Sequence, residues 1–271
     1  MNQENLSYFK SFFETPPLWS GQFDGLWQFV FPDIDFTSLK TNSIPPNLRL
    51  GHKIEHIFLQ LIQHSEQFKL IGHNIPIRRN KISLGEIDFI IQNTKNQEYT
   101  HIELTYKFYL LRKEKSAVEY NLIGPNKKDS FYLKKEKIKN RQIPLLRTPE
   151  AIEVLKALGI TLHEISHRVC FKSQIFIPFS DHSVVLAPFS TQCIVGKYLS
   201  YKEFGSTPFT SSHFYMPSKQ EWLLAPHDQV PWLNFNQVLQ EMAHRRSNNI
   251  STMLWVRNQI TEIEKLFLVW W

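Results

Sequence analysis

Residues 101–110 alternate strictly between two kinds of side chain, which predicts a β-strand with two different faces. One face is polar and the other is mainly apolar, so we expect a strand that lies against a core on one side. The polar face carries His101, Glu103, Thr105, Lys107 and Tyr109, and the other face carries Ile102, Leu104, Tyr106, Phe108 and Leu110.

The alternating segment is the third strand of a predicted antiparallel meander. Residues 69–78 and 81–92 form the first two strands, joined by a tight turn at Arg79 and Asn80, and residues 99–111 form the third. Gly85 interrupts the second strand, which indicates a bulge or a close approach of another segment. A helix with one apolar side is predicted from Leu48 onward, just before the meander.

The segments after the meander complete an α/β pattern. Helices are predicted at residues 129–142 and 149–158, followed by a strand at 168–177. The signals weaken beyond residue 178, where we expect a helix near 236–244 and a closing strand at 266–271. The order helix, three strands, two helices, strand predicts an α/β fold.

Three regions are expected along the chain. Residues 1–44 are rich in aromatic residues and proline and predict an arm that packs on the main body, residues 45–180 form the core, and residues 181–271 form a C-terminal extension. With 42% hydrophobic residues, a chain of this length can bury a sizeable core.

Positive charge is concentrated in one segment. The formal net charge is +6, but residues 107–147 alone carry twelve Lys or Arg against four acidic residues. Such a block favours a polyanionic partner, although a lysine-rich solvated helix face gives the same composition. The candidate phosphate contacts are Lys127, Lys128, Lys134 and Lys135.

Several classes of protein are not expected. The sequence contains no apolar run long enough for a membrane helix, and its first 20 residues lack a signal-peptide pattern. Two cysteines are too few for a disulfide framework. These features predict a soluble, cytoplasmic protein that does not bind membranes, while the oligomeric state stays open.

Two acidic residues on neighbouring predicted strands form a candidate metal site. Asp88 and Glu103 are expected to converge beside Lys107, with Glu55 arriving from the preceding helix. Carboxylates hold a hard cation such as Mg²⁺ or Mn²⁺, and this arrangement is what phosphodiester hydrolysis needs. The alternative is structural: a half-exposed strand whose polar face carries cross-strand ion pairs, including Glu86.

At these residues the sequence resembles the PD-(D/E)XK nuclease superfamily, through residues 85–90 and 101–105 with the preceding helix and His73-Asn74. More narrowly, the chain is similar over about its whole length to the bacterial family called domain of unknown function 1853. The segments that carry this similarity are 49–51, 84–89, Glu103, 107–109, 124–126, 198–199 and 203–204.

The resemblance implies a restriction-endonuclease-like α-β-β-β-α-β core with a mixed sheet and metal-dependent phosphodiester cleavage. Nucleic acid is the expected substrate, with DNA favoured over RNA, and the choice between the two stays open. The resemblance also implies Asp88 and Glu103 as metal ligands, together with the Leu104 carbonyl, and Glu55 as the helix glutamate. Glu86 and Thr105 are expected to lie next to the ligands. The sequence departs from the pattern at Thr105, where the superfamily has lysine; Lys107 lies about 7 Å further along the strand.

Two other functions are weighed. Thr105 in place of lysine favours a nuclease fold that binds nucleic acid without cutting it. His163-Glu164-Ile165-Ser166-His167 matches the HExxH pattern of zinc proteases, which requires a helix. Because this segment leads into a predicted strand, its two histidines would lie about 13 Å apart and could not share an ion.

Overall fold

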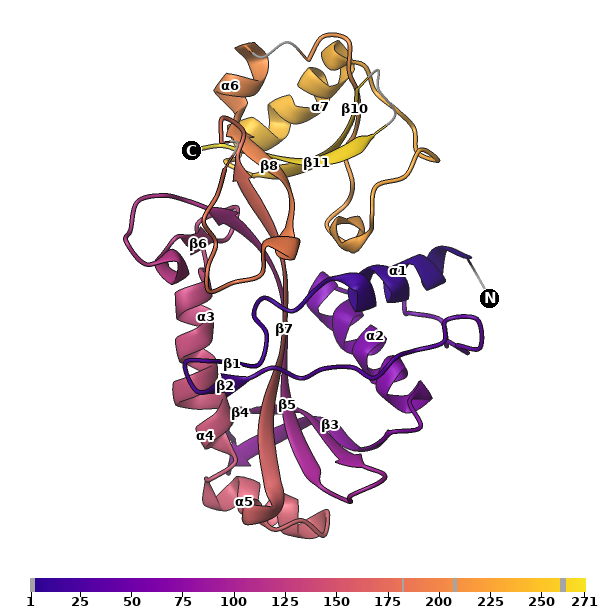
Figure 1. The fold of residues 1–271 in the computed structure, drawn as a ribbon, viewed down its shortest axis with the longest axis vertical. Coiled ribbons are helices and arrows are strands. Elements are labelled where there is room, and N and C mark those ends of the chain that lie inside the picture. Colours follow the sequence, from indigo (N-terminus) through magenta and orange to yellow (C-terminus); the bar gives the residue numbers. More distant parts are fainter. Residues whose placement is uncertain (1–2, 182, 207–208, 259–261) are drawn as a thin grey trace. The chain divides into compact units, whose positions relative to one another are not determined.

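The computed structural model describes residues 3–181, 183–206, 209–258 and 262–271, and its architecture is mixed α/β (Figure 1). The chain forms two compact units, each built from two separate stretches. The first unit contains Met1–Tyr106 and Leu133–Lys172, and the second contains Lys107–Tyr132 and Ser173–Trp271. The predicted arm at residues 1–44 therefore belongs to the first unit.

The strands of the first unit include the predicted meander. Strands β3 (Phe68–Arg79) and β4 (Ile82–Asn93) pair antiparallel, and β4 pairs antiparallel with β5 (Tyr99–Leu111). Strand β7 (Ile165–Pro178) lies next to β5 in the sheet, and it begins three residues earlier than expected. The three meander strands are confirmed to within one residue at each end.

Helices cover these strands. The first unit contains α1 (Gln3–Glu14), α2 (Leu50–His64), most of α3 (Phe131–Lys137), a π-helical turn η2 (Ile138–Gln142), α4 (Ile143–Leu145), α5 (Pro149–Ala157) and the short helix η3 (Leu162–Glu164). It also contains a small hairpin, β1 (Gln22–Phe23) with β2 (Leu26–Trp27).

The meander has two differently covered faces. Phe89 of β4 points toward α2, where its ring lies 4.6 Å from that of Phe58. Asp88 is the adjacent residue, so its side chain points to the opposite face. That face is covered by the α3–α4 segment, because Gln142 of η2 is hydrogen-bonded to Glu103 of β5. Figure 1 shows α2 and the α3–α4 segment on opposite sides of these strands.

Gly85 lies at a close approach between β4 and α4. Its φ of +156° is unusual for other residues, and an added Cβ would lie 2.9 Å from Cδ2 of Leu145. The pairing of β3 with β4 is irregular just beyond the Ile77–Gly85 pair. The glycine that interrupts the predicted strand thus marks both a bulge and a close packing contact.

We expect Gly85→Ala to destabilise the first unit by about 1–3 kcal/mol. The new methyl group must displace the side chain of Leu145, and the alanine backbone must adopt a strained φ. Urea unfolding followed by circular dichroism measures this change. Gly51→Ala is the matched control, because a Cβ at this helical position meets nothing within 4 Å and should stabilise the helix slightly. Equal unfolding midpoints for the two variants would contradict the packing assignment.

The second unit contains the remaining parts of β5 and β7 and a set of later strands. Strand β7 pairs parallel with β8 (Ile194–Ser200), β8 pairs parallel with β11 (Ile263–Val269), and β11 pairs antiparallel with β10 (Thr252–Arg257), so the sheet is mixed. Its other elements are β6 (Leu122–Ile123), β9 (His213–Tyr215), α6 (Tyr201–Ser206), α7 (Phe235–Ser247), η1 (Val118–Tyr120), η4 (Thr191–Cys193) and η5 (Glu221–Leu223).

The late elements were partly foreseen from the sequence. Helix α7 and strand β11 confirm the helix expected near 236–244 and the closing strand, although the strand begins and ends earlier than expected. Cys170 and Cys193 are buried and unpaired with each other. None of the helices in the described part of the chain has the length and apolar character that crossing a membrane requires.

Candidate metal centre

Asp88 and Glu103 stand at the next position along β4 and β5 after the last paired residues. The register pairs Ile90 with His101 and Phe89 with Ile102, so the next residues along the strands are Asp88 and Glu103. Directly opposed residues of an antiparallel pair point to the same face. Leu104, the residue after Glu103, donates its amide to Oδ2 of Asp88 at 3.0 Å, so the Asp88 carboxyl lies beside this part of β5. The sheet therefore brings both acids to one place.

The two carboxyl groups differ in burial and in their partners. The Glu103 side chain is 0% exposed, and its Oε2 accepts a hydrogen bond from Nε2 of Gln142. Asp88 is half-buried, and its Oδ2 accepts a hydrogen bond of 3.0 Å from the Leu104 amide. Glu103 is thus held deep in the first unit, while Asp88 is partly open to solvent.

Burial makes it costly for both acids to be ionised. Burial and the nearby Glu103 together raise the pKa of Asp88 to about 7, against the opposing effects of the Leu104 amide and Lys134. Burial likewise raises the pKa of Glu103 to about 7, against the opposing effect of Lys134. At neutral pH the metal-free pair therefore holds part of its protons, as expected for two acids that share one site.

Three polar atoms on the same face of β5 lack hydrogen-bond partners among the described residues. They are Oε1 of Glu103, Oγ1 of Thr105 and Nε2 of His101, all buried. Burial lowers the pKa of His101 to about 4, so this ring is neutral and does not balance Glu103 although Nε2 lies 3.2 Å from Oε1. Buried polar atoms normally have partners, so the face suits a polar occupant.

The donor set is small. Within the described ranges, no group of three or more His, Cys, Asp or Glu side chains is arranged to hold a metal ion. The protein side chains thus offer two carboxylates, and an ion held by them would keep room for water or substrate oxygens. Mg²⁺ is commonly bound in this way, with one or two carboxylates and several waters.

The raised pKa of Asp88 has a consequence for stability. The pKa of this acid is higher in the folded state than its ordinary value of 3.8. The folded protein therefore loses stability as pH rises from 3.8 to about 7. Asp88→Asn removes this charge, so we expect the metal-free variant to melt at a higher temperature than the wild type at pH 8 and at a similar temperature at pH 4.

Differential scanning calorimetry with a chelator at both pH values checks this expectation, with a change of about 2–4 °C for each kcal/mol. The comparison must be made between variant and wild type at the same pH. Burial lowers the pKa values of His101 and His167 to about 4. These two residues therefore increase the stability of the folded protein as pH rises from about 4 to 6.5, which opposes the effect of the acids. A variant less stable at pH 8 would contradict the electrostatic description.

Among the interactions of the described residues, Glu55 contacts α2 and β3 rather than Asp88 or Glu103. Glu55 lies on α2, the helix that covers the face of Phe89, and its Oε2 is 3.1 Å from Nδ1 of His52. Asn74 of β3 donates a 3.3 Å hydrogen bond to the same oxygen. In contrast, Glu86 is exposed on β4 and raises the pKa of Glu103 electrostatically. Of Glu55 and Glu86, the acid that acts on the Asp88–Glu103 pair is therefore Glu86.

The predicted lysines have different surroundings. In the second unit, Nζ of Lys107 lies 2.6 Å from Oδ2 of Asp129, Lys127 lies over the ring of Trp271 at 4.1 Å, and Lys128 is exposed. In the first unit, Lys135 is buried and lies 2.8 Å from Asp24, whereas Lys134 donates a 3.0 Å hydrogen bond to Gln142.

Sequence reasoning missed Gln142 and the position of Lys134 beside the acids. Lys134 was considered as a phosphate contact, and Gln142 was the last residue of a predicted helix with nothing to distinguish it. The two residues are eight positions apart, which leaves them about 80° apart around a regular α-helix. Only the π-helical turn between them, which no sequence pattern indicated, explains their contact.

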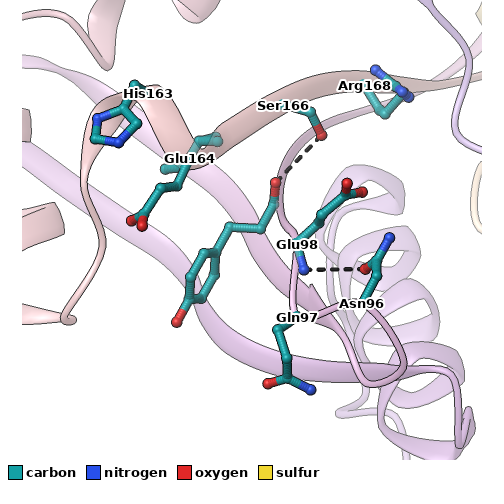
Figure 2. Close-up of a pocket in the computed structure, with 9 residues that line it drawn as sticks. Asn96, Gln97, Glu98, His163, Glu164, Ser166 and Arg168 are labelled. Atoms are coloured by element: carbon teal, nitrogen blue, oxygen red, sulfur yellow. Dashed lines mark hydrogen bonds between the residues drawn. The ribbon is translucent and has the colours of Figure 1, made fainter.

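The HExxH segment does not form a helix. His163 and Glu164 lie in η3, and His167 lies in β7, where its Nδ1 is 3.2 Å from Nδ1 of His101. Figure 2 shows His163 and Glu164 at a surface pocket shared with Glu98, Ser166 and the turn at Asn96–Gln97; His167 is not among its lining residues. The two histidines thus do not face a common ion position.

Comparison with known proteins gives one match. The family model described as Domain of unknown function (DUF1853) matches residues 33–269 of the chain. No curated protein and no solved structure matches the chain.

Proposed function

The chain belongs to the DUF1853 family, and we propose that it is a metal-dependent phosphodiesterase that cleaves nucleic acid, with DNA favoured over RNA. The observation that carries the proposal is the Asp88–Glu103 pair: two acids on neighbouring strands, one held by the Leu104 amide and the other by Gln142, in a face with unsatisfied polar atoms. We propose that both carboxylates and the Leu104 carbonyl hold one Mg²⁺ or Mn²⁺ ion.

The residues fit such an ion on chemical grounds. Hard divalent cations take oxygen ligands, and the positive charge of the ion would favour the ionised form of both acids. Oε1 of Glu103 is buried without a hydrogen-bond partner in the described structure, so it is available as a ligand atom for the cation. When bound, the cation supplies Lewis acidity and lowers the pKa of coordinated water.

The residues around the pair have separate tasks in this proposal. Gln142 fixes the orientation of Glu103 by donating to Oε2, and the Leu104 amide fixes Asp88 by donating to Oδ2. Asp88 is the partly exposed member, so we propose that a phosphate group approaches the ion from its side. The buried, neutral His101 limits the access of water to Glu103.

The order of elements supports the finer fold assignment. Helix α2, strands β3, β4 and β5, the α3–α5 helices and strand β7 follow one another as the resemblance to the PD-(D/E)XK superfamily implies. We propose a restriction-endonuclease-like core on this basis. The choice of nucleic acid rests on the twelve basic residues between 107 and 147, and the preference for DNA rests on the same resemblance.

Calorimetric titration with Mg²⁺ and Mn²⁺, followed by incubation with supercoiled plasmid, tests the proposal. We expect one cation per chain and nicking that stops when EDTA is added. Glu98→Gln, which removes a carboxylate from the separate pocket of Figure 2, serves as control and should behave like the wild type. Binding of DNA without cleavage would instead favour the binding module, and absence of cation binding would refute the metal centre.

A further inference from the structure

The candidate centre has no lysine at the position where the resemblance expects one. Thr105 stands there, and Lys107 forms an ion pair of 2.6 Å with Asp129 in the second unit. A basic residue of the first unit, Lys134, is instead connected to Glu103 through Gln142. Nζ of Lys134 donates to Oε1 of Gln142, whose Nε2 donates to Oε2 of Glu103.

We propose that Lys134 is a positioning residue of the metal centre, which acts through Gln142 to fix Glu103 for cation binding. This inference rests on the proposed function, and it gives Lys134 a different task from the phosphate contact expected from the sequence. Three features of the molecule support this assignment: the direction of the hydrogen bonds, the shape of the helix and the charge of the lysine.

The direction of the hydrogen bonds follows from the chemistry of lysine. An ammonium group can donate but not accept, so it requires the oxygen of the Gln142 amide. The amide nitrogen must then point to Glu103, where it donates to Oε2. Oε1 of Glu103 is left without a partner in the described structure. Without Lys134 the amide is free to flip and place its oxygen against an ionised carboxylate.

The shape of the helix makes the contact possible. At 3.6 residues per turn, Gln142 would lie about 80° around the helix from Lys134. The π-helical turn at Ile138–Gln142 holds more residues in each turn and reduces this offset. Isolated π-helical turns are rare and occur frequently at functional sites. Both side chains thereby reach the side of the helix that faces Glu103.

The charge of Lys134 supports the same assignment. Lys134 lowers the pKa of Asp88 and that of Glu103, and for Glu103 it is the largest effect that opposes burial. Lys135, the adjacent residue, is bound to Asp24 instead.

The test uses Lys134→Gln, the conservative Lys134→Arg, and Lys156→Gln as control on the exposed side of α5. We expect Lys134→Gln to weaken Mn²⁺ binding at pH 7 by about 10–100-fold, the usual cost of losing a residue that orients a ligand. In steady-state cleavage, kcat should fall while KM for DNA stays the same. Lys134→Arg, which also only donates, should recover most of the loss, and Lys156→Gln should match the wild type.

A second measurement separates this proposal from the proposed function. The carboxyl ¹³C signals of the metal-free protein report the pKa values of the two acids, and in Lys134→Gln they should shift upward by about half a unit or more. The positioning role would be overturned if Lys134→Gln left the carboxyl pKa values and the Mn²⁺ affinity unchanged. It would also be overturned if the variant changed KM for DNA alone. A wild-type protein that binds no Mn²⁺ refutes the metal centre, whereas the carboxyl titration still decides whether Lys134 acts on the acids.

Discussion

Asp88→Asn is expected to reduce cation-dependent DNA cleavage by at least about 100-fold. Asparagine keeps the size of the side chain and can still accept the hydrogen bond from the Leu104 amide, but it removes one of the two negative charges that hold the cation. Glu103→Gln should have a similar effect, because its carboxylate is the buried member of the pair. Plasmid nicking with Mn²⁺ and calorimetric titration measure both losses.

The control for this prediction must show that the loss is chemical and not a loss of fold. The expected rise in melting temperature of metal-free Asp88→Asn at pH 8 provides that evidence, since a misfolded variant would melt lower. Cleavage at the wild-type rate by either variant would remove these acids from the mechanism.

Phe58→Ala is expected to destabilise the first unit by about 3–5 kcal/mol, the usual cost of removing a fully buried aromatic ring. Phe58 is 0% exposed, and its ring lies 5.1 Å from that of Phe31 and 4.6 Å from that of Phe89. The substitution leaves a cavity between α2 and β4 that neighbouring rings fill only in part. Urea unfolding of the first unit, followed by fluorescence, measures the change.

Leu133→Ala is the matched control for Phe58→Ala. Leu133 is 60% exposed on α3, so its truncation should change stability by less than about 0.5 kcal/mol. If both substitutions cost the same, α2 would not be packed on the meander as described. Loss of activity in Phe58→Ala at a temperature where it is folded would indicate in addition that α2 supports the position of β4.

The part of the site that could be predicted is the part built from regular strands. The alternation around Glu103 determines which side chains share a face, and the two-strand register brings Asp88 and Glu103 to the next position after the last paired residues. Gly85 indicated the irregularity beside Asp88 before the structure located Leu145 against it. Strand periodicity is a local property, so a single sequence is enough to recognise it.

The part that could not be predicted depends on partners distant in the sequence. Lys107 pairs with Asp129, and Lys135 with Asp24, so two residues of the basic block are neutralised by acids 22 and 111 positions away. Gln142 reaches Glu103 through a π-helical turn that no periodicity indicates.

The division of the chain was also beyond local signals. The second unit takes residues 107–132 from the middle of the expected core and joins them to residues 173–271. Strands β5 and β7 are long and each contributes to both units, so no linker of Pro, Gly or Ser marks the boundary. Composition therefore indicates regions of the chain, whereas the units are defined by contacts.

The most direct test of the metal centre is a crystal structure of the protein soaked with Mn²⁺, with the cation located by its anomalous scattering. The account predicts one strong peak bonded to a carboxylate oxygen of Asp88 and to one of Glu103, which disappears in Asp88→Asn. Peaks at other residues alone, or none at saturating Mn²⁺, would contradict it.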